Sequence, residues 1–113
     1  MTFGSYGGSH GHYDKISFVF FGHGQELPID LGRAKNQAYR LHIHKNWYKA
    51  TISHNNVLVD GQSQQPAKGQ VKFFQKSHTH ATIGAIFEEA YPGVKHTRTL
   101  SIYEDFLLLI DQL

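Results

Sequence analysis

The sequence contains no cysteine among its 113 residues. A disulfide framework and a thiolate metal site are therefore excluded, and any metal ion must be held by nitrogen and oxygen ligands. Charge of one sign is also scarce, because charged residues make up 18% of the chain and the formal net charge is +2. Since nucleic-acid binding usually relies on a strongly basic surface, we expect no nucleic-acid partner.

Long apolar runs are missing as well. The longest, residues 16–21 and 106–110, are far shorter than the roughly 20 residues that cross a bilayer, so we expect no membrane span. The N-terminus has neither the basic nor the apolar region of a secretory signal. The length fits a single domain over residues 1–113. The glycine-rich start and apolar end suggest a domain truncated at both ends.

Histidine, by contrast, is abundant, with nine residues spread from His10 to His96. This spread is not that of a purification tag. Six of the histidines form three His-x-His pairs, which begin at His10, His42 and His78. Residues two apart on a strand point to the same face, so each pair could direct two imidazoles at one ligand.

Aromatic and β-branched residues cluster in short runs separated by Gly, Asn and Asp, which indicates an all-β chain. The predicted strands are residues 15–21, 26–30, 50–54, 56–60, 70–75, 82–88, 98–103 and 106–110. A C-terminal helix is the alternative to the last two strands, because several apolar residues there also fit a helical period. Residues 32–49 fit neither period and predict a long ordered loop with one helical turn.

Two imidazoles and one carboxylate are a common zinc ligand set, completed by water. His12, Asp30 and His54 would supply such a set from three separate elements. Glycines on both sides of His10 would leave its imidazole unshielded, as a cleft residue requires. Nine histidines and nine acidic residues allow many other triples, however, so the residues alone leave the choice of ligands open.

Four blocks, residues 8–18, 29–33, 48–61 and 90–98, resemble the heparinase II/III-like domain of polysaccharide lyases in both order and spacing. The resemblance implies an antiparallel β-sandwich, here a fragment of a larger β-sandwich module. In that family the sandwich follows an α/α toroid, and the two parts enclose a cleft for an acidic polysaccharide. Alginate-like and heparan-like chains are both compatible with this resemblance.

The resemblance also implies roles for individual residues. His12, Asp30 and His54 match the family's zinc ligands, and His10 matches the histidine near the cleaved bond. Tyr39 matches a substrate-facing tyrosine, with a packing contact as the alternative. These residues would contribute to a β-elimination for which the toroid supplies further groups. We therefore expect the chain alone to be inactive, and we expect a periplasmic or secreted location by analogy.

Two other functions are compatible with the residues. A cupin-like metal-dependent enzyme would also use a His-x-His pair, but the glutamate expected soon after that pair is absent following His12. A non-catalytic carbohydrate-binding module would use exposed aromatic residues such as Trp47 and Tyr48. Bound iron would favour the cupin-like enzyme, whereas glycan binding without a contribution to cleavage would favour the binding module.

Overall fold

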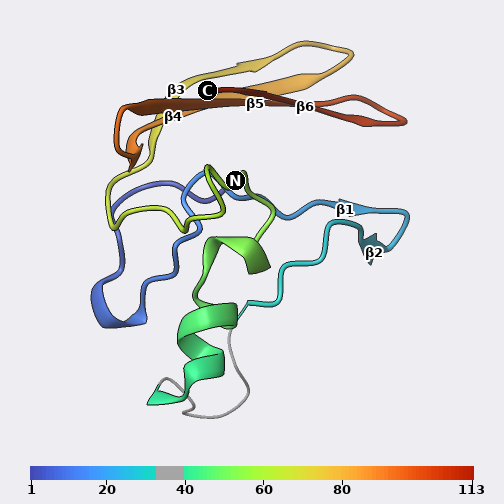
Figure 1. The fold of residues 1–113 in the computed structure, drawn as a ribbon. Helices are drawn as coiled ribbons and strands as arrows, with labels where there is room; N and C mark the ends of the chain where they lie inside the picture. The colour runs from blue at the N-terminus through green and yellow to red at the C-terminus, as the bar shows by residue number, and fades with distance from the viewer. Residues whose placement is uncertain (33–39) are drawn as a thin grey trace.

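A computed structural model describes residues 1–32 and 40–113 of the chain. Six strands and three short helical segments follow one another in these residues (Figure 1). Their order is η1 (Gly8–His10), β1 (Phe21–Gly22), β2 (Gln25–Glu26), η3 (His44–Tyr48), η4 (Thr51–Ser53), β3 (Gln70–Lys76), β4 (Ala81–Tyr91), β5 (Val94–Ile102) and β6 (Leu107–Gln112). The chain is thus nearly all-β, as predicted.

The last four strands form one antiparallel sheet in the order β3-β4-β5-β6. In its register Ile83 pairs with Leu100, and Leu100 pairs with Leu109. Gly93, with φ +76°, allows the tight turn between β4 and β5. The C-terminal residues form two strands joined by a turn at 103–106, so the prediction of strands rather than a helix is confirmed.

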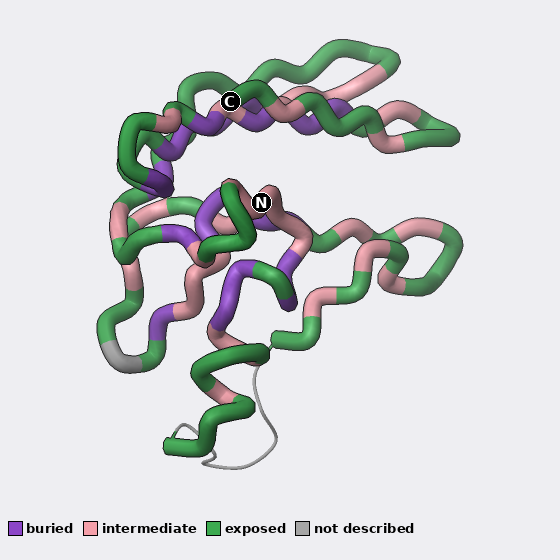
Figure 2. Tube along the Cα trace, in the orientation of Figure 1, coloured by how far each residue is buried: buried purple, intermediate pink, exposed green. Residues whose placement is uncertain are grey.

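A second layer lies against one face of this sheet (Figure 1). It consists of the β1–β2 hairpin, the short helical segments and long irregular stretches of chain. Buried residues gather where the two layers meet (Figure 2). The central cluster is Ile16, Ala85, Phe87, Ala90 and Tyr91. Two antiparallel sheets with a core between two layers agree with the predicted β-sandwich.

The strand predictions were wrong for most of the second layer. Within the predicted strand 50–54 the chain forms the 3-10 segment η4 (Thr51–Ser53), and residues 56–60 form no strand apart from a single bridge between Val59 and Gln62. Side-chain amides take the place of a neighbouring strand here, because Gln64 bonds both the N–H (3.0 Å) and the carbonyl (3.0 Å) of Lys15. Ile16, with φ +58°, also interrupts the extended run predicted for residues 15–21.

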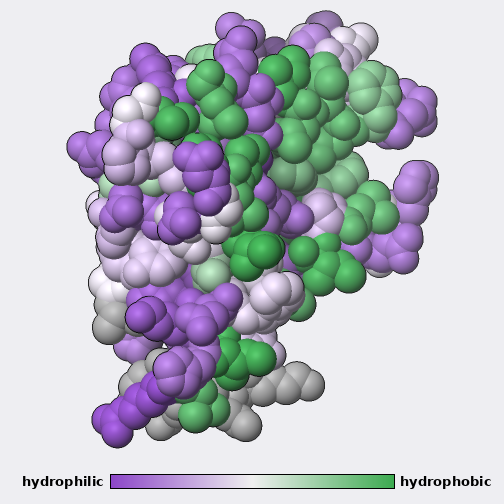
Figure 3. Space-filling view, viewed as in Figure 1, coloured by the Kyte–Doolittle hydropathy of each residue, from purple (hydrophilic) through white to green (hydrophobic). Residues whose placement is uncertain are grey.

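Apolar side chains line a cavity of about 130 Å³ between the sheet and the chain before β1. Phe18 and Phe20 line it from the second layer, and Phe74, Ile83 and Leu100 line it from the sheet. Figure 3 shows apolar side chains gathered on this side of the molecule, above and below the gap. Within the described residues, no helix has both the length and the apolar character needed to cross a membrane.

Candidate functional site

Three separate segments bring His12, Asp30 and His54 together. Nδ1 of His54 lies 3.0 and 3.1 Å from the two carboxylate oxygens of Asp30. The ring of His12 lies beside that of His54, with 5.2 Å between the centroids. The structure therefore places the three predicted metal ligands in one cluster, although they are far apart in the sequence.

Backbone contacts hold the segment of His12 against the segment of His54. The N–H of Tyr13 donates to the carbonyl of Lys49 (2.9 Å), and the hydroxyl of the buried Thr51 donates to the carbonyl of Tyr13 (2.7 Å). Since Thr51 begins the short 3-10 segment that ends just before His54, these two bonds fix both histidine-bearing segments to each other.

Asp30 is held by its own local structure. One of its carboxylate oxygens accepts a hydrogen bond from the N–H of Gly32 (2.9 Å), a turn that Gly32 permits with φ +56°. The Nδ2 atom of Asn55, next to His54, donates to the carbonyls of Phe18 (2.9 Å) and Pro28 (3.0 Å). Asn55 therefore ties the chain just before Asp30 to the chain just after His54.

The surroundings of His12 favour its neutral imidazole. Burial of the ring is the main cause that lowers the pKa of His12, and the neighbouring His54 lowers it further. His44 acts in the same direction, whereas Asp14 and Asp30 oppose it. A neutral imidazole is the form that binds a metal ion or accepts a proton.

His54 has one ring nitrogen without a partner. Its Nδ1 lies 3.0 Å from a carboxylate oxygen of Asp30, and Nε2 lies on the opposite side of the ring. Nε2 is buried and has no hydrogen-bond partner among the described residues. Buried polar atoms without a partner are uncommon, but Nε2 points away from Asp30, so a metal ion shared with Asp30 would bind Nδ1 instead. Even so, no three His, Asp or Glu side chains of the described chain are arranged as a formed metal site.

His10 is exposed at the end of η1, four residues before Asp14. The turn needs its glycines, because a Cβ atom on Gly11 would come within 2.6 Å of the backbone nitrogen of Gly7. Gly8 has φ +61°, which favours glycine over other residues. The imidazole of His10 therefore projects from a tight glycine turn. The other predicted catalytic residue, Tyr39, lies outside the described residues.

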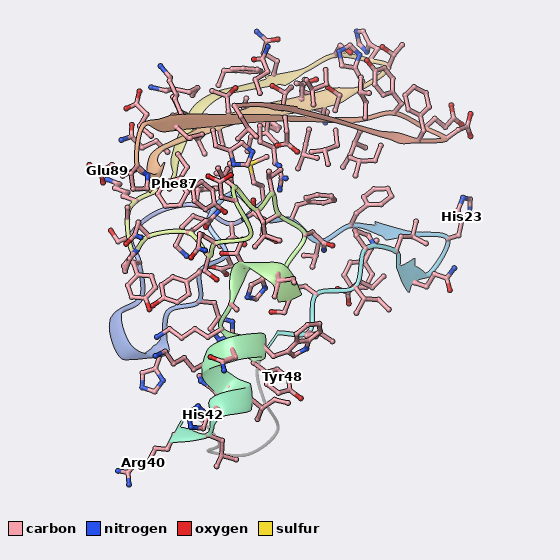
Figure 4. The ribbon with its side chains drawn as sticks, in the orientation of Figure 1. His23, Arg40, His42, Tyr48, Phe87 and Glu89 are labelled. Atoms are coloured by element: carbon pink, nitrogen blue, oxygen red, sulfur yellow. The ribbon has the colours of Figure 1, made fainter. Side chains whose placement is uncertain are left out.

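The argument that His-x-His pairs share a strand face was wrong for all three pairs, since none of them lies within a strand. His10 and His12 lie in and after a 3-10 turn, and His78 and His80 lie at the turn between β3 and β4. Figure 4 shows His42 at the end of the helical segment remote from the sheet. Of that pair, only His44 reaches the site.

Sequence reasoning did not place His44 and Lys49 in the site. The ring of His44 meets that of His12 edge to face, with 6.2 Å between the centroids. The ammonium group of Lys49 lies 5.4 and 5.5 Å from the ring centroids of Tyr6 and Tyr13. Lys49 falls within a block of the family resemblance, a signal that could have identified it. His44 carried no comparable signal.

Comparison with known proteins identifies the family of the chain. Residues 1–113 match the sequence profile of the family described as heparinase II/III-like, C-terminal. The chain is 32% identical over 111 residues to an alginate lyase of Stenotrophomonas maltophilia (strain K279a), a match that covers 85% of this chain and 15% of that protein. It is 28% identical over 111 residues to an exo-oligoalginate lyase of Saccharophagus degradans (strain 2-40), with the same coverage of both proteins. The chain thus spans 15% of the length of these curated relatives. This chain belongs to the heparinase II/III-like, C-terminal family.

Proposed function

We propose that this chain is the zinc-binding wall of the substrate cleft in a lyase that cleaves uronic-acid-containing polysaccharides by β-elimination. Its family and the two alginate-cleaving relatives support this assignment. The names of those relatives favour an alginate-like substrate over a heparan-like one. A periplasmic or secreted location, where such polysaccharides are found, is part of the proposal.

The observation that carries the metal assignment is the meeting of His12, Asp30 and His54, in which the carboxylate of Asp30 lies 3.0 Å from Nδ1 of His54 and the ring of His12 lies beside that of His54. Two imidazole nitrogens and a carboxylate suit Zn²⁺, and the contact between Asp30 and His54 already keeps two of the three donors together. Bound zinc would supply a fixed link between the three segments. Since β-elimination needs no activated hydroxide, we assign this ion a structural role.

In the proposed reaction, a base removes the proton from the carbon next to the uronate carboxylate. The bond from C4 to the leaving sugar oxygen breaks, a carbon–carbon double bond forms, and the leaving oxygen takes up a proton. The exposed imidazole of His10 is suited to assist this proton transfer or to hold the substrate, because histidine exchanges protons near neutral pH. An α/α toroid in the full-length protein supplies the remaining groups, so the chain alone is inactive.

Two histidine variants of the full-length protein test this proposal. His54→Ala should lose bound zinc and stability together, because it removes one of three protein ligands. His10→Ala should keep the zinc and lower turnover by about 10²-fold or more, the usual contribution of a proton-transfer group. Metal analysis gives the zinc content, and the ultraviolet absorbance of the unsaturated uronate product gives the rate.

His23→Ala is the control for both variants, because His23 is exposed at the turn of the β1–β2 hairpin (Figure 4). It should change neither zinc content nor rate. Loss of zinc from His10→Ala, or full zinc content in His54→Ala, would contradict the assigned ligands. Iron in place of zinc would favour a cupin-like enzyme. Unchanged cleavage by His10→Ala, with glycan still bound, would favour a carbohydrate-binding module.

A further inference from the structure

A buried arginine of the sheet bridges the two segments that carry the site histidines. Arg98, near the middle of β5, is only 2% exposed. Its Nη1 atom donates to the carbonyl of Ile16 (2.8 Å) and to the carbonyl of Asn55 (2.6 Å). Ile16 follows four residues after His12, and Asn55 directly follows His54. One guanidinium nitrogen therefore contacts both segments at once.

The guanidinium is fixed from its other side by Asp111 of β6, which pairs with Arg98 in the sheet register. Nε donates to Oδ1 (2.7 Å) and Nη2 donates to Oδ2 (2.9 Å), which is a two-pronged contact. Oδ1 also accepts a hydrogen bond from Nε2 of His96, which is fully buried (2.7 Å). Because Asp111 holds both Nε and Nη2, Nη1 is directed at the carbonyls of Ile16 and Asn55.

The backbone at Ile16 needs such support. Ile16 has φ +58°, a conformation that is unfavourable for a β-branched residue. Its N–H donates to the carbonyl of Thr2 (2.7 Å), and its carbonyl accepts from Arg98. The contact with Arg98 thus holds a strained turn in the chain that leads away from His12. A lysine could not replace it, because an ammonium group lacks the planar fork that engages Asp111 and both carbonyls.

We propose that Arg98, oriented by Asp111, is the positioning residue that fixes the separation of the His12 and His54 segments and thereby sets the zinc affinity of the site. This inference rests on the proposed zinc function. It assigns the β5–β6 pair a role in the site although neither strand contributes a ligand. Residues that orient metal ligands commonly change metal affinity by 10–100-fold when they are replaced.

Two variants on β5 distinguish an effect on the position of the histidine segments from an effect on the stability of the fold. Arg98→Lys should lower zinc affinity at least tenfold in a competition with a chelator of known affinity. Leu100→Ala is the matched control, because Leu100 is also buried, lies on the same face of β5 and lines the apolar cavity. It should lower the melting temperature while the protein that remains folded keeps its zinc affinity. Equal zinc affinity in Arg98→Lys and the parent would overturn the inference.

A measurement on metal-free protein keeps the inference separate from the zinc proposal. Nuclear magnetic resonance of the imidazoles should show the His54 tautomer held by Asp30 and a proton contact between the His12 and His54 rings, which lie 5.2 Å apart. Arg98→Lys should lose that contact, whereas Leu100→Ala should keep it. If the parent binds no zinc but this difference appears, the zinc function fails and the positioning role stands. If the contact persists in Arg98→Lys, the positioning role fails.

Asp111→Asn provides a second variant in case Arg98→Lys does not fold. The amide keeps the shape of the carboxylate but presents an N–H₂ group to one prong of the guanidinium, so Arg98 loses its orientation. The expected change is again a weaker zinc affinity and a weakened contact between the two rings, with far-ultraviolet circular dichroism confirming the fold. A folded Asp111→Asn protein with the affinity and ring contact of the parent would overturn the inference.

Discussion

Asn55 makes hydrogen bonds to three parts of the molecule. Its amide donates to the carbonyls of Phe18 and Pro28, and its own carbonyl accepts from Arg98. The adjacent His54 directs its ring at Asp30. Two neighbouring residues therefore have different roles. His54 supplies an imidazole to the site, and Asn55 holds the surrounding chain in place.

The first prediction concerns this residue. Asn55→Ala should lower the free energy of unfolding by about 1–3 kcal/mol, since the carbonyls of Phe18 and Pro28 lose their donor in a partly buried position. Urea denaturation measures the loss. The matched control is Asn46→Ala, because Asn46 is exposed on the helical segment; this change should have an effect within about 0.5 kcal/mol. Similar effects of the two substitutions would contradict the role of Asn55.

Among the elements, β5 and β6 carry a buried charged cluster on the face toward the second layer. His96 and Arg98 of β5 both contact Asp111 of β6. Burial raises the pKa of the Asp111 carboxyl, but the hydrogen bonds from His96 and Arg98 and the charge of Arg98 outweigh it. Together they lower the pKa from its ordinary 3.8 to about 2. The folded sheet therefore strongly favours the ionised carboxylate.

A pH dependence of stability follows from this lowered pKa. In acid the unfolded chain takes up a proton on Asp111 near pH 3.8, before the folded chain does so near pH 2. The cluster therefore stabilises the fold fully above pH 3.8, and this contribution of about 2 kcal/mol is lost as the pH falls through about 2. Urea denaturation over this pH range measures it.

Asp111→Asn is the matched variant for that experiment, because an amide does not titrate in this range. Its free energy of unfolding should be lower than that of the parent at neutral pH, since Arg98 loses its charged partner. The difference between the two proteins should narrow as the solution becomes more acidic. A constant difference across the acid range would contradict the lowered pKa.

For the molecule as a whole, zinc is expected to act as a clamp on the second layer. That layer has few strand pairs and depends on side-chain contacts with the backbone. A ligand that binds only the folded state adds about 4 kcal/mol when its concentration is a thousandfold above its dissociation constant. We therefore expect exhaustive chelation to lower the melting temperature and added zinc to restore it.

Two variants assign that response to the site. The melting temperature of His54→Ala should no longer depend on zinc, whereas that of His23→Ala should respond like the parent. Differential scanning calorimetry with and without added zinc provides the comparison. An unchanged fold and melting temperature after removal of zinc from the parent would contradict the clamp, and would leave the lyase assignment to be tested by the activity of His10→Ala.

The four-stranded sheet could be predicted from the sequence because its runs of aromatic and β-branched residues are separated by turn residues. Alternation along a strand was a weaker guide, since in β5 Leu100 is buried as expected but Ser101 is also buried and Ile102 is exposed. The same kind of pattern misled for Thr51, which is fully buried but lies in a 3-10 turn. There the hydroxyl bonds the carbonyl of Tyr13, and local propensity yields to that distant contact.

Composition limited the chemistry open to this protein, because without cysteine any metal ligands would be imidazoles and carboxylates, and the spaced blocks of the sequence identify the family. The resemblance selected His12, Asp30 and His54, and the structure brings these residues together. Only the tertiary structure revealed that Arg98 holds the histidine-bearing segments. Its bond to Ile16 joins residues 82 positions apart, and such a contact depends on how two layers pack, which no local pattern along the chain records.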